Sequence, residues 1–499
     1  MVQPKGNTHH LEPIVAISIA QRSAKQSFAL SYFLYIKAMV VFFTQIAIAR
    51  MLTPESIGIV ALSSSLFVVV KLFARWGLSE AIIVESDKRP KLTDTIFWIR
   101  LAYVLIVLIV VLAFLPVIQH FYESHVVTIF YILLLPVLLG LFTEFPLAYL
   151  QKNLRLKQQG FIDLVTTILA SITVVVMAYN GFDLWALTLY VVLNFLLPFF
   201  AFWIVSPYRP RFKFSIEDLK WFYHFGKNIF LGESAGMLIN QQGDNAILGT
   251  IKGPVPLGFY SMANKLSSAT QIVSISGILT ASLPTFSLLR DNSVKLRQAY
   301  EYIVRNLSRL IIPTHILLGI LAPELITFFF GQNWLPAVPI FRILLIYLIV
   351  NQLSRIEILF HYGIGSPKSI FKAQLLGLSI FLIFAIPLTI YWGSIGMALT
   401  LDVAFSFSYW FMVKQTRKKI GNSIWPHLKI ITAATLISAL VVLLTELLLP
   451  KIALTRIILQ SIIFGISYVS VLLILEKNQL VEDVKKIHKL VFSKSKNRR

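Results

Sequence analysis

Lys71 and Arg75 are charged residues near the middle of an apolar run over residues 57–84, and Lys37 lies similarly within the run over 28–49. Residues four apart share one face of a helix, so Lys71 and Arg75 would project together. Each cation would cost about 2.5–3.5 kcal/mol at the centre of a lipid bilayer. All three side chains are therefore expected to face protein or a water-filled cavity.

Two like charges on one helix face repel each other unless an anion lies opposite them. The anion could be a ligand, because arginine offers a bidentate fork and lysine a mobile point charge for phosphate. It could also be a carboxylate of the chain itself, and Glu80, Glu144 and Asp163 are the candidates. Lys265, in a later apolar run, is a weaker candidate for the same cationic site.

A stripe of polar residues runs through the apolar segment 221–249. Glu233, Met237, Asn240 and Asp244 recur at the spacing of one helix face. Carboxamides both donate and accept hydrogen bonds, as sugar hydroxyls require. The alternative is a hydrogen-bond network between helices. Glu233 and Asp244 could also take up a coupling proton or Na⁺.

A second polar group occurs in "NQLSRIEILFHYGIGS", residues 351–366. Helical spacing places Ser354, Glu357 and His361 on one face and Arg355 on another. This face could bind a proton. Alternatively, its polar side chains could be hydrogen-bonded to one another in the protein interior. The histidines show no ligand spacing and the chain has no cysteine, so no metal site and no tightly bound cofactor are expected.

Five further cations lie toward the ends of apolar runs, where long side chains usually reach water. We expect them to be exposed; they are Arg100, Lys227, Arg305, Arg309 and Arg342.

The elements that hold these residues are membrane-spanning helices. The chain has 499 residues, of which 57% are hydrophobic and only 14% charged, and about 20 apolar residues cross a bilayer as a helix. Fourteen spans are predicted, over residues 28–49, 57–84, 95–118, 126–150, 158–179, 183–205, 221–249, 256–285, 300–322, 337–361, 370–391, 394–413, 427–449 and 455–475. The loops between them are too short for a further domain, and the fold class is an all-α membrane protein.

The distribution of basic residues predicts the orientation. Of 45 lysines and arginines, 31 fall in alternate segments that include both termini, and four fall in the segments between. Cytoplasmic loops carry such an excess. Both termini are therefore expected in the cytoplasm, and nucleic-acid binding is not needed to explain the net charge of +22.

The chain repeats itself at an offset of about 200 residues. Pro54 and Gly58 match Pro254 and Gly258, and the letters ALTL recur 212 positions apart. Spans 1–6 and 7–12 therefore read as two copies of one unit, with two extra spans after them. An even number of spans makes the copies parallel repeats, which predicts a central cavity between two lobes.

Four segments resemble one family. They are "IARMLTPESIGIVAL" (48–62), "AYLQKNLRLKQ" (148–158), "RPRFKFSIEDLKWFYHFGKNI" (209–229) and "DNAILGTIKGPVPLGFYSMANKL" (244–266). Together with the 6+6+2 arrangement, they resemble the bacterial polysaccharide-export flippases, including the Wzx-type O-antigen flippases. These belong to the multidrug/oligosaccharidyl-lipid/polysaccharide exporter superfamily. The chain departs from the pattern at Thr250, where the second copy lacks the arginine found at Arg50.

This resemblance implies a non-enzymatic flippase with a V-shaped, alternately open cavity like that of the superfamily's multidrug exporters. Its substrate would be an undecaprenyl-pyrophosphate-linked oligosaccharide for surface polysaccharide, moved across the bacterial inner membrane without ATP. Lys37, Lys71, Arg75 and Lys265 would then bind the pyrophosphate. A polysaccharide polymerase and a chain-length regulator are expected partners. The alternatives are a flippase for the peptidoglycan lipid precursor, a cation-coupled multidrug exporter, and a membrane polymerase or ligase.

The predicted organisation follows from the spans. It comprises a cytoplasmic lead-in (1–27), a first lobe (28–205), a linker (206–220), a second lobe (221–413), two extra helices (414–475) and a basic tail (476–499). The tail is expected to lie on anionic lipid.

Overall fold

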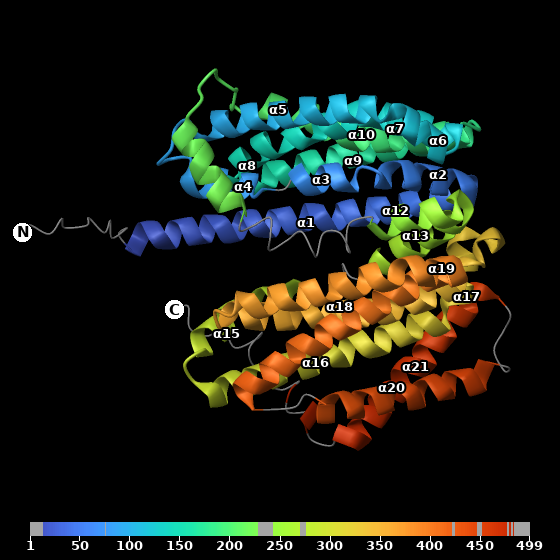
Figure 1. Ribbon diagram of the computed structural model, residues 1–499. Helices are drawn as coiled ribbons and strands as arrows, with labels where there is room; N and C mark the ends of the chain where they lie inside the picture. Colours follow the sequence, from blue (N-terminus) through green and yellow to red (C-terminus); the bar gives the residue numbers. More distant parts are fainter. Residues whose placement is uncertain are drawn as a thin grey trace, which may run out of the picture. The chain divides into compact units, whose positions relative to one another are not determined.

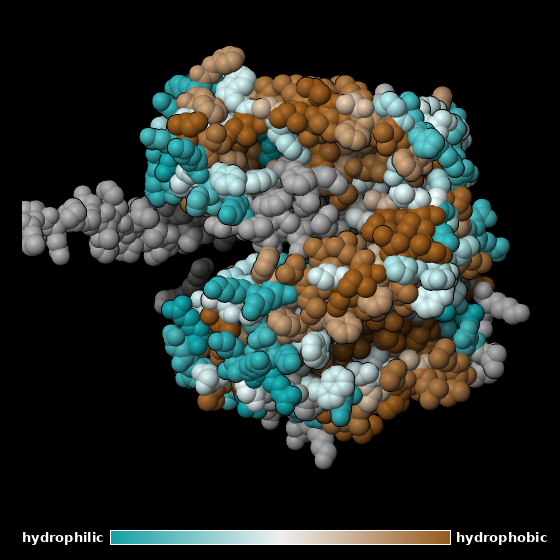
Figure 2. Space-filling view, in the orientation of Figure 1, coloured by the Kyte–Doolittle hydropathy of each residue, from teal (hydrophilic) through white to brown (hydrophobic). Residues whose placement is uncertain are grey.

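The computed structural model describes residues 13–74, 76–227, 243–269, 276–421, 425–446, 452–476, 479–480 and 483. All regular structure in these residues is helical, and ten helices are long and apolar enough to cross a membrane. Hydrophobic side chains cover the sides of the helices and hydrophilic ones gather at helix ends (Figure 2). The protein is a multi-pass membrane protein of the predicted all-α class. The number fourteen stays a prediction, as do the lobe boundaries.

The chain forms two compact units, and the first comprises residues 1–51 and 66–234. In this unit α9 packs between α1 and α10, α7 packs on α10, and α4 packs on α8 (Figure 1). Its helices are α1 (Pro13–Met51), α3 (Val68–Ala74), α4 (Leu78–Glu85), α5 (Leu92–Ala113), α6 (Leu115–Phe121), α7 (Ser124–Gly140), η1 (Leu141–Thr143), α8 (Glu144–Lys152), α9 (Leu156–Tyr179) and α10 (Asp183–Val205).

The second unit comprises residues 52–65 and 235–499. In this unit α18 packs against α13, α15, α16 and α19, while α20 and α21 pair beside α16 (Figure 1). Its helices are α2 (Pro54–Ser65), α12 (Gly243–Lys252), α13 (Pro254–Ala269), α15 (Ser276–Leu289), α16 (Ser293–Ile320), α17 (Ala322–Phe330), η2 (Gln332–Trp334), α18 (Ala337–Gly363), α19 (Pro367–Ile420), α20 (Trp425–Thr445) and α21 (Ala453–Glu476).

The segment 57–84, expected as one span, is divided into α2, α3 and α4. Gly77 before α4 has a φ of 67°, a left-handed conformation that glycine adopts without strain and that ends a helix. The chain is therefore interrupted directly after the predicted cationic site, and α2 packs against α13 in the second unit.

The helix α19 contains two predicted spans, joined at Gly393. A straight helix of 54 residues would be about 80 Å long, far more than one bilayer thickness. Gly393 instead has φ 57° and ψ −131°, and a Cβ on Gly396 would lie 1.9 Å from the carbonyl oxygen of Leu388. The chain therefore turns sharply at Gly393, as the two separate spans predicted.

The segment that follows α10 is fixed to the first unit by polar contacts. The Tyr208 hydroxyl donates to the Asp94 carboxylate at 3.1 Å, and Arg89 pairs with Asp218 at 3.0 Å. Burial, together with the Asp94 carboxylate, raises the pKa of Tyr208, so this hydroxyl remains a hydrogen-bond donor. The linker predicted from the sequence thus belongs structurally to the first unit.

Three of the cations expected to be exposed are instead buried. Arg100 donates to the Glu144 carboxylate at 3.2 Å, and Arg305 and Arg309 both donate to Asp483, each at 2.9 Å. A buried guanidinium needs such a partner because desolvating a charge is costly. The expectation was wrong because the partners come from distant parts of the sequence. Lys227 and Arg342 are exposed as expected.

Candidate functional site

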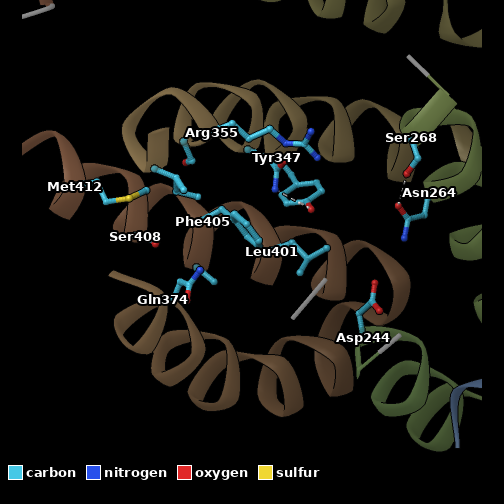
Figure 3. Close-up of a pocket in the computed structure, with 15 residues that line it drawn as sticks. Asp244, Asn264, Ser268, Tyr347, Arg355, Gln374, Leu401, Phe405, Ser408 and Met412 are labelled. Atoms are coloured by element: carbon cyan, nitrogen blue, oxygen red, sulfur yellow. Dashed lines mark hydrogen bonds between the residues drawn. The ribbon is translucent and has the colours of Figure 1, made fainter. Parts of the chain in front are cut away.

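The second unit contains a cavity of about 450 Å³ between α12, α13, α18 and α19. Figure 3 shows side chains from these helices projecting toward one space. The lining residues on α18 and α19 recur at three- and four-residue intervals, so one face of each helix forms a wall. The lining residues are Asp244, Asn264, Ser268, Tyr347, Asn351, Ser354, Arg355, Ile358, Gln374, Gly377, Leu401, Ala404, Phe405, Ser408 and Met412.

Uncharged polar groups form much of the lining. Asn264, Asn351 and Gln374 contribute carboxamides, and Ser268 and Ser408 contribute hydroxyls. A carboxamide has both a donor and an acceptor, so it can donate a hydrogen bond to a sugar hydroxyl or accept one from it. Such a lining suits a polyhydroxylated ligand better than an apolar one.

Tyr347 and Phe405 form an aromatic part of the wall. Their ring centroids lie 4.8 Å apart with an interplanar angle of 75°, an edge-to-face pair. Both rings line the cavity from facing helices, α18 and α19. A flat ring offers the apolar face of a sugar a contact surface while the polar groups bind its hydroxyls.

Arg355 is the cation of this cavity. Its side chain is exposed and extends from α18 beside the Tyr347 ring (Figure 3). A guanidinium binds phosphate oxygens through two parallel hydrogen bonds. Ser354, Glu357 and His361 are buried whereas Arg355 is exposed, although Ser354 and Arg355 both line the cavity. The sequence did not lead us to place Arg355 in a cavity, although its position inside an apolar run was a usable signal.

Asp244 is the one residue of the predicted polar stripe that the described part of the chain contains, and it lines the cavity. The residue is 4% exposed, and its carboxylate accepts a 2.6 Å hydrogen bond from the Tyr260 hydroxyl. The other members, Glu233, Met237 and Asn240, lie outside the described residues. The carboxylate is thus held at the cavity wall, and its role in ion coupling stays a prediction.

The predicted cationic site falls mainly in the first unit. Lys37 of α1 forms an ion pair with Asp163 of α9 at 3.8 Å, and both side chains are partly exposed. Lys71, in the last turn of α3, has its Nζ 5.5 Å from the centroid of the Phe195 ring, a cation–π contact. Arg75 lies outside the described residues.

Lys265 is placed differently from its neighbours on α13. Asn264 and Ser268 line the cavity of the second unit, whereas Lys265 is exposed and does not contribute to its lining. A phosphate-binding role for Lys37, Lys71, Arg75 and Lys265 stays a prediction.

Comparison with solved structures identifies the fold. The structure of the lipid II flippase MurJ in an inward closed conformation matches with a TM-score of 0.74, covering 90% of this chain and 99% of that chain at 15% identity. An inward-facing multidrug resistance MATE family transporter of the MOP superfamily matches with a TM-score of 0.57, covering 78% of this chain and 96% of that one at 16% identity. The fold is therefore that of this superfamily of transporters.

The chain belongs to the polysaccharide biosynthesis protein family, whose model matches residues 47–339. The succinoglycan biosynthesis transport protein ExoT of Rhizobium meliloti is 24% identical over 61% of this chain and 61% of its own length. The teichuronic acid biosynthesis protein TuaB of Bacillus subtilis is 24% identical over 54% of this chain and 56% of its own length. The chain thus matches about three fifths of the length of these relatives, and the family predicted from the sequence is confirmed.

Proposed function

We propose that the protein is a flippase that moves an undecaprenyl-pyrophosphate-linked oligosaccharide across the bacterial cytoplasmic membrane by alternating access. The observation that carries this proposal is the cavity of the second unit, where Arg355 lies among carboxamides, hydroxyls and two aromatic rings. A guanidinium suits a phosphate, and the neutral polar groups suit sugars. Membership of a polysaccharide biosynthesis family supports the same substrate class. The product would supply O-antigen, capsule or exopolysaccharide synthesis.

The cations divide into two groups by position. Lys37 and Lys71 lie in the first unit, and Arg75 is adjacent to the end of α3, while Arg355 lies in the second unit. Pyrophosphate carries several negative charges, and the cations of each unit are separate candidates for binding it. Lys265, exposed on α13, would contribute from outside the cavity lining.

The orientation and the partners follow from the same proposal. Both termini would lie in the cytoplasm, in keeping with the excess of lysine and arginine in alternate segments. The protein would act as a transporter and not as an enzyme, drawing on an ion gradient or on removal of its product. A polysaccharide polymerase and a chain-length regulator would receive the translocated unit.

Two other transport functions are less well supported. A multidrug exporter for cationic compounds would be disfavoured by the guanidinium of Arg355 in the cavity, because like charges repel. A flippase for the peptidoglycan lipid precursor would share the phosphate requirement, and the likeness to MurJ at 15% identity shows the fold alone.

Translocation in proteoliposomes tests the proposal. The purified protein is expected to move a fluorescent undecaprenyl-pyrophosphate oligosaccharide and not a cationic dye, with lipid II as the competing substrate. Arg355→Ala is expected to lower translocation by roughly tenfold or more, because hydrogen bonds to charged groups contribute about 1.5–3 kcal/mol. Arg342→Ala is the matched control, since Arg342 is exposed on the same helix but does not line this cavity. Preferential transport of lipid II or of the dye would overturn the proposal.

A further inference from the structure

A buried polar cluster lies directly beside the cavity on the same two helices. Glu357 and His361 of α18 are 1% and 0% exposed, and Thr416 of α19 is 1% exposed. Ser354, one turn before Glu357, lines the cavity, as does Met412, one turn before Thr416. The cluster and the cavity therefore share the walls formed by α18 and α19.

The three side chains form a continuous hydrogen-bonded chain. The Thr416 hydroxyl donates to Glu357 Oε2 at 2.5 Å, and the same hydroxyl oxygen lies 3.2 Å from His361 Nε2. The hydroxyl has one hydrogen, which it donates to the ionised carboxylate. Its oxygen can therefore only accept from His361, so Nε2 carries a hydrogen and donates to the hydroxyl. The hydrogen bonds thus run in one direction, from His361 through Thr416 to Glu357.

The surroundings contain few charges to balance the carboxylate. Glu357 Oε1 accepts a hydrogen bond from the Tyr300 hydroxyl of α16, and no ion pair to Glu357 occurs within the described ranges. Among the described residues, the other titratable groups near Glu357 and His361 are Tyr409, beside Glu357, and Lys419, beside His361, both on α19. The carboxylate therefore lies in an apolar core with hydroxyl groups as its hydrogen-bond donors, where burying an uncompensated charge is costly.

The imidazole ring has one nitrogen available for a proton. Nδ1 of His361 is buried and makes no hydrogen bond to the described residues, while the backbone of Met412 lies beside the ring. His361 is two residues from the end of α18, and the exposed Lys419 lies nearby. Glu357 is the member nearest to the cavity.

We propose that the chain His361–Thr416–Glu357 binds the proton that is coupled to transport; this inference rests on the proposed transport function. A proton binds Nδ1 of His361, the hydrogen on Nε2 passes to the Thr416 oxygen, and the Thr416 hydrogen passes to Glu357. The result is a neutral Glu357, a neutral His361 with its hydrogen on Nδ1, and a chain of hydrogen bonds in the opposite direction. One proton is taken up, and each intermediate group gains one hydrogen and loses one.

Proton uptake would affect the cavity through α18 and α19. Neutralising Glu357 weakens the hydrogen bond that it accepts from Tyr300 and reverses the one with Thr416, because charge-assisted bonds are the stronger ones. These bonds link α18 to α16 and α19 immediately beside the cavity wall. The protonated and unprotonated states therefore favour different packing of the helices that contact the substrate, which is the requirement for coupling.

Proton flux measured together with translocation tests this inference. In proteoliposomes containing a pH-sensitive dye, addition of the lipid-linked oligosaccharide is expected to drive proton movement through the wild-type protein. Glu357→Gln and Thr416→Val are expected to lower that flux by roughly tenfold or more, because neither an amide nor a methyl group relays a proton. Thr416→Ser restores the hydroxyl and should recover most of the flux.

Thr400→Val is the matched control for the loss of a buried hydroxyl. Thr400 is also fully buried on α19, but its hydroxyl donates to the backbone of Gly396 and has no titratable partner. This variant should show wild-type flux, and thermal unfolding of every variant separates loss of fold from loss of coupling.

The outcomes distinguish the two proposals. Wild-type proton flux in a folded Glu357→Gln or Thr416→Val variant overturns the inference. Oligosaccharide translocation by the wild-type protein without any proton movement also overturns it, and leaves the flippase function standing. No translocation of the oligosaccharide by the wild-type protein overturns the proposed function itself.

Discussion

Gly58 and Gly258 make reciprocal close contacts, each with the backbone of the proline that precedes the other. A Cβ on Gly58 would lie 1.8 Å from the carbonyl oxygen of Pro254, and a Cβ on Gly258 would lie 1.9 Å from that of Pro54. Both helices involved, α2 and α13, belong to the second unit. The sequence aligns these two Pro–Gly motifs at an offset of 200 residues. The structure therefore brings two copies of one motif together in a self-complementary contact.

Replacing either glycine should destabilise the protein. Gly58→Ala and Gly258→Ala each place a methyl group against rigid backbone, and overpacking of this kind costs roughly 1–3 kcal/mol. We expect a lower melting temperature in detergent for both variants, by similar amounts. Gly465→Ala is the control, because a Cβ there meets nothing within 4 Å. Equal melting temperatures for all three variants would contradict the proposed close packing.

The predicted cationic site can be tested in the first unit. The double variant Lys71→Ala, Arg75→Ala should abolish translocation while the protein still accumulates in the membrane. Arg75→Lys, which keeps the charge but loses the bidentate fork, should retain part of the activity. Translocation and membrane abundance must be measured together. Full activity in a folded double variant would show that these cations do not serve the substrate.

The buried ion pairs on α16 make a separate prediction about stability. Asp483→Asn removes the carboxylate to which Arg305 and Arg309 both donate, and breaking a buried pair costs roughly 3–5 kcal/mol. Thermal unfolding should show a clear loss. The control is Asp291→Asn, since Asp291 is exposed beside Arg290 and exposed pairs contribute little. If Asp483→Asn unfolds at the same temperature as Asp291→Asn, the buried ion pairs of Arg305 and Arg309 do not stabilise the fold.

The orientation makes a topological prediction. Reporter fusions after Lys152 and after Lys419 should report the cytoplasm, and a fusion near Gly181 should report the opposite side. The physical reason is the retention of lysine- and arginine-rich segments in the cytoplasm. A cytoplasmic signal near Gly181 would be incompatible with two six-span copies.

Much of the fold was predictable because its signal is local. Apolar runs correspond to α5, α9, α10, α16, α18 and α21, and glycine at position 393 marked the boundary inside α19. The match between Pro54–Gly58 and Pro254–Gly258 predicted an internal repeat, and the structure brings these two motifs into contact. The division of the segment 57–84 was not predicted, since Gly77 in a mainly apolar run does not by itself indicate a left-handed turn.

The site was less predictable because it depends on contacts between distant residues. Arg305 and Asp483 pair through two nitrogens of the guanidinium, yet they are 178 positions apart. No local sequence pattern connects residues at that separation. Arg355 had an identifiable helix face, but its cavity is formed by residues of α12, α13 and α19 that no periodicity links to α18. Of the residues expected to bind substrate or ions, only Asp244 lines the cavity among those that the structure describes.

The shared use of α18 and α19 has an evolutionary consequence. Both helices line the cavity, and beside the lining residues they hold the buried His361, Thr416 and Glu357. A substitution at positions 354–358 or 408–412 that admits a bulkier saccharide would also shift the groups proposed to bind the proton. A change of cargo would therefore require a compensating change in the energy-coupling machinery. If the proposed function holds, relatives of this chain with different substrates should carry paired substitutions in these two segments rather than single ones.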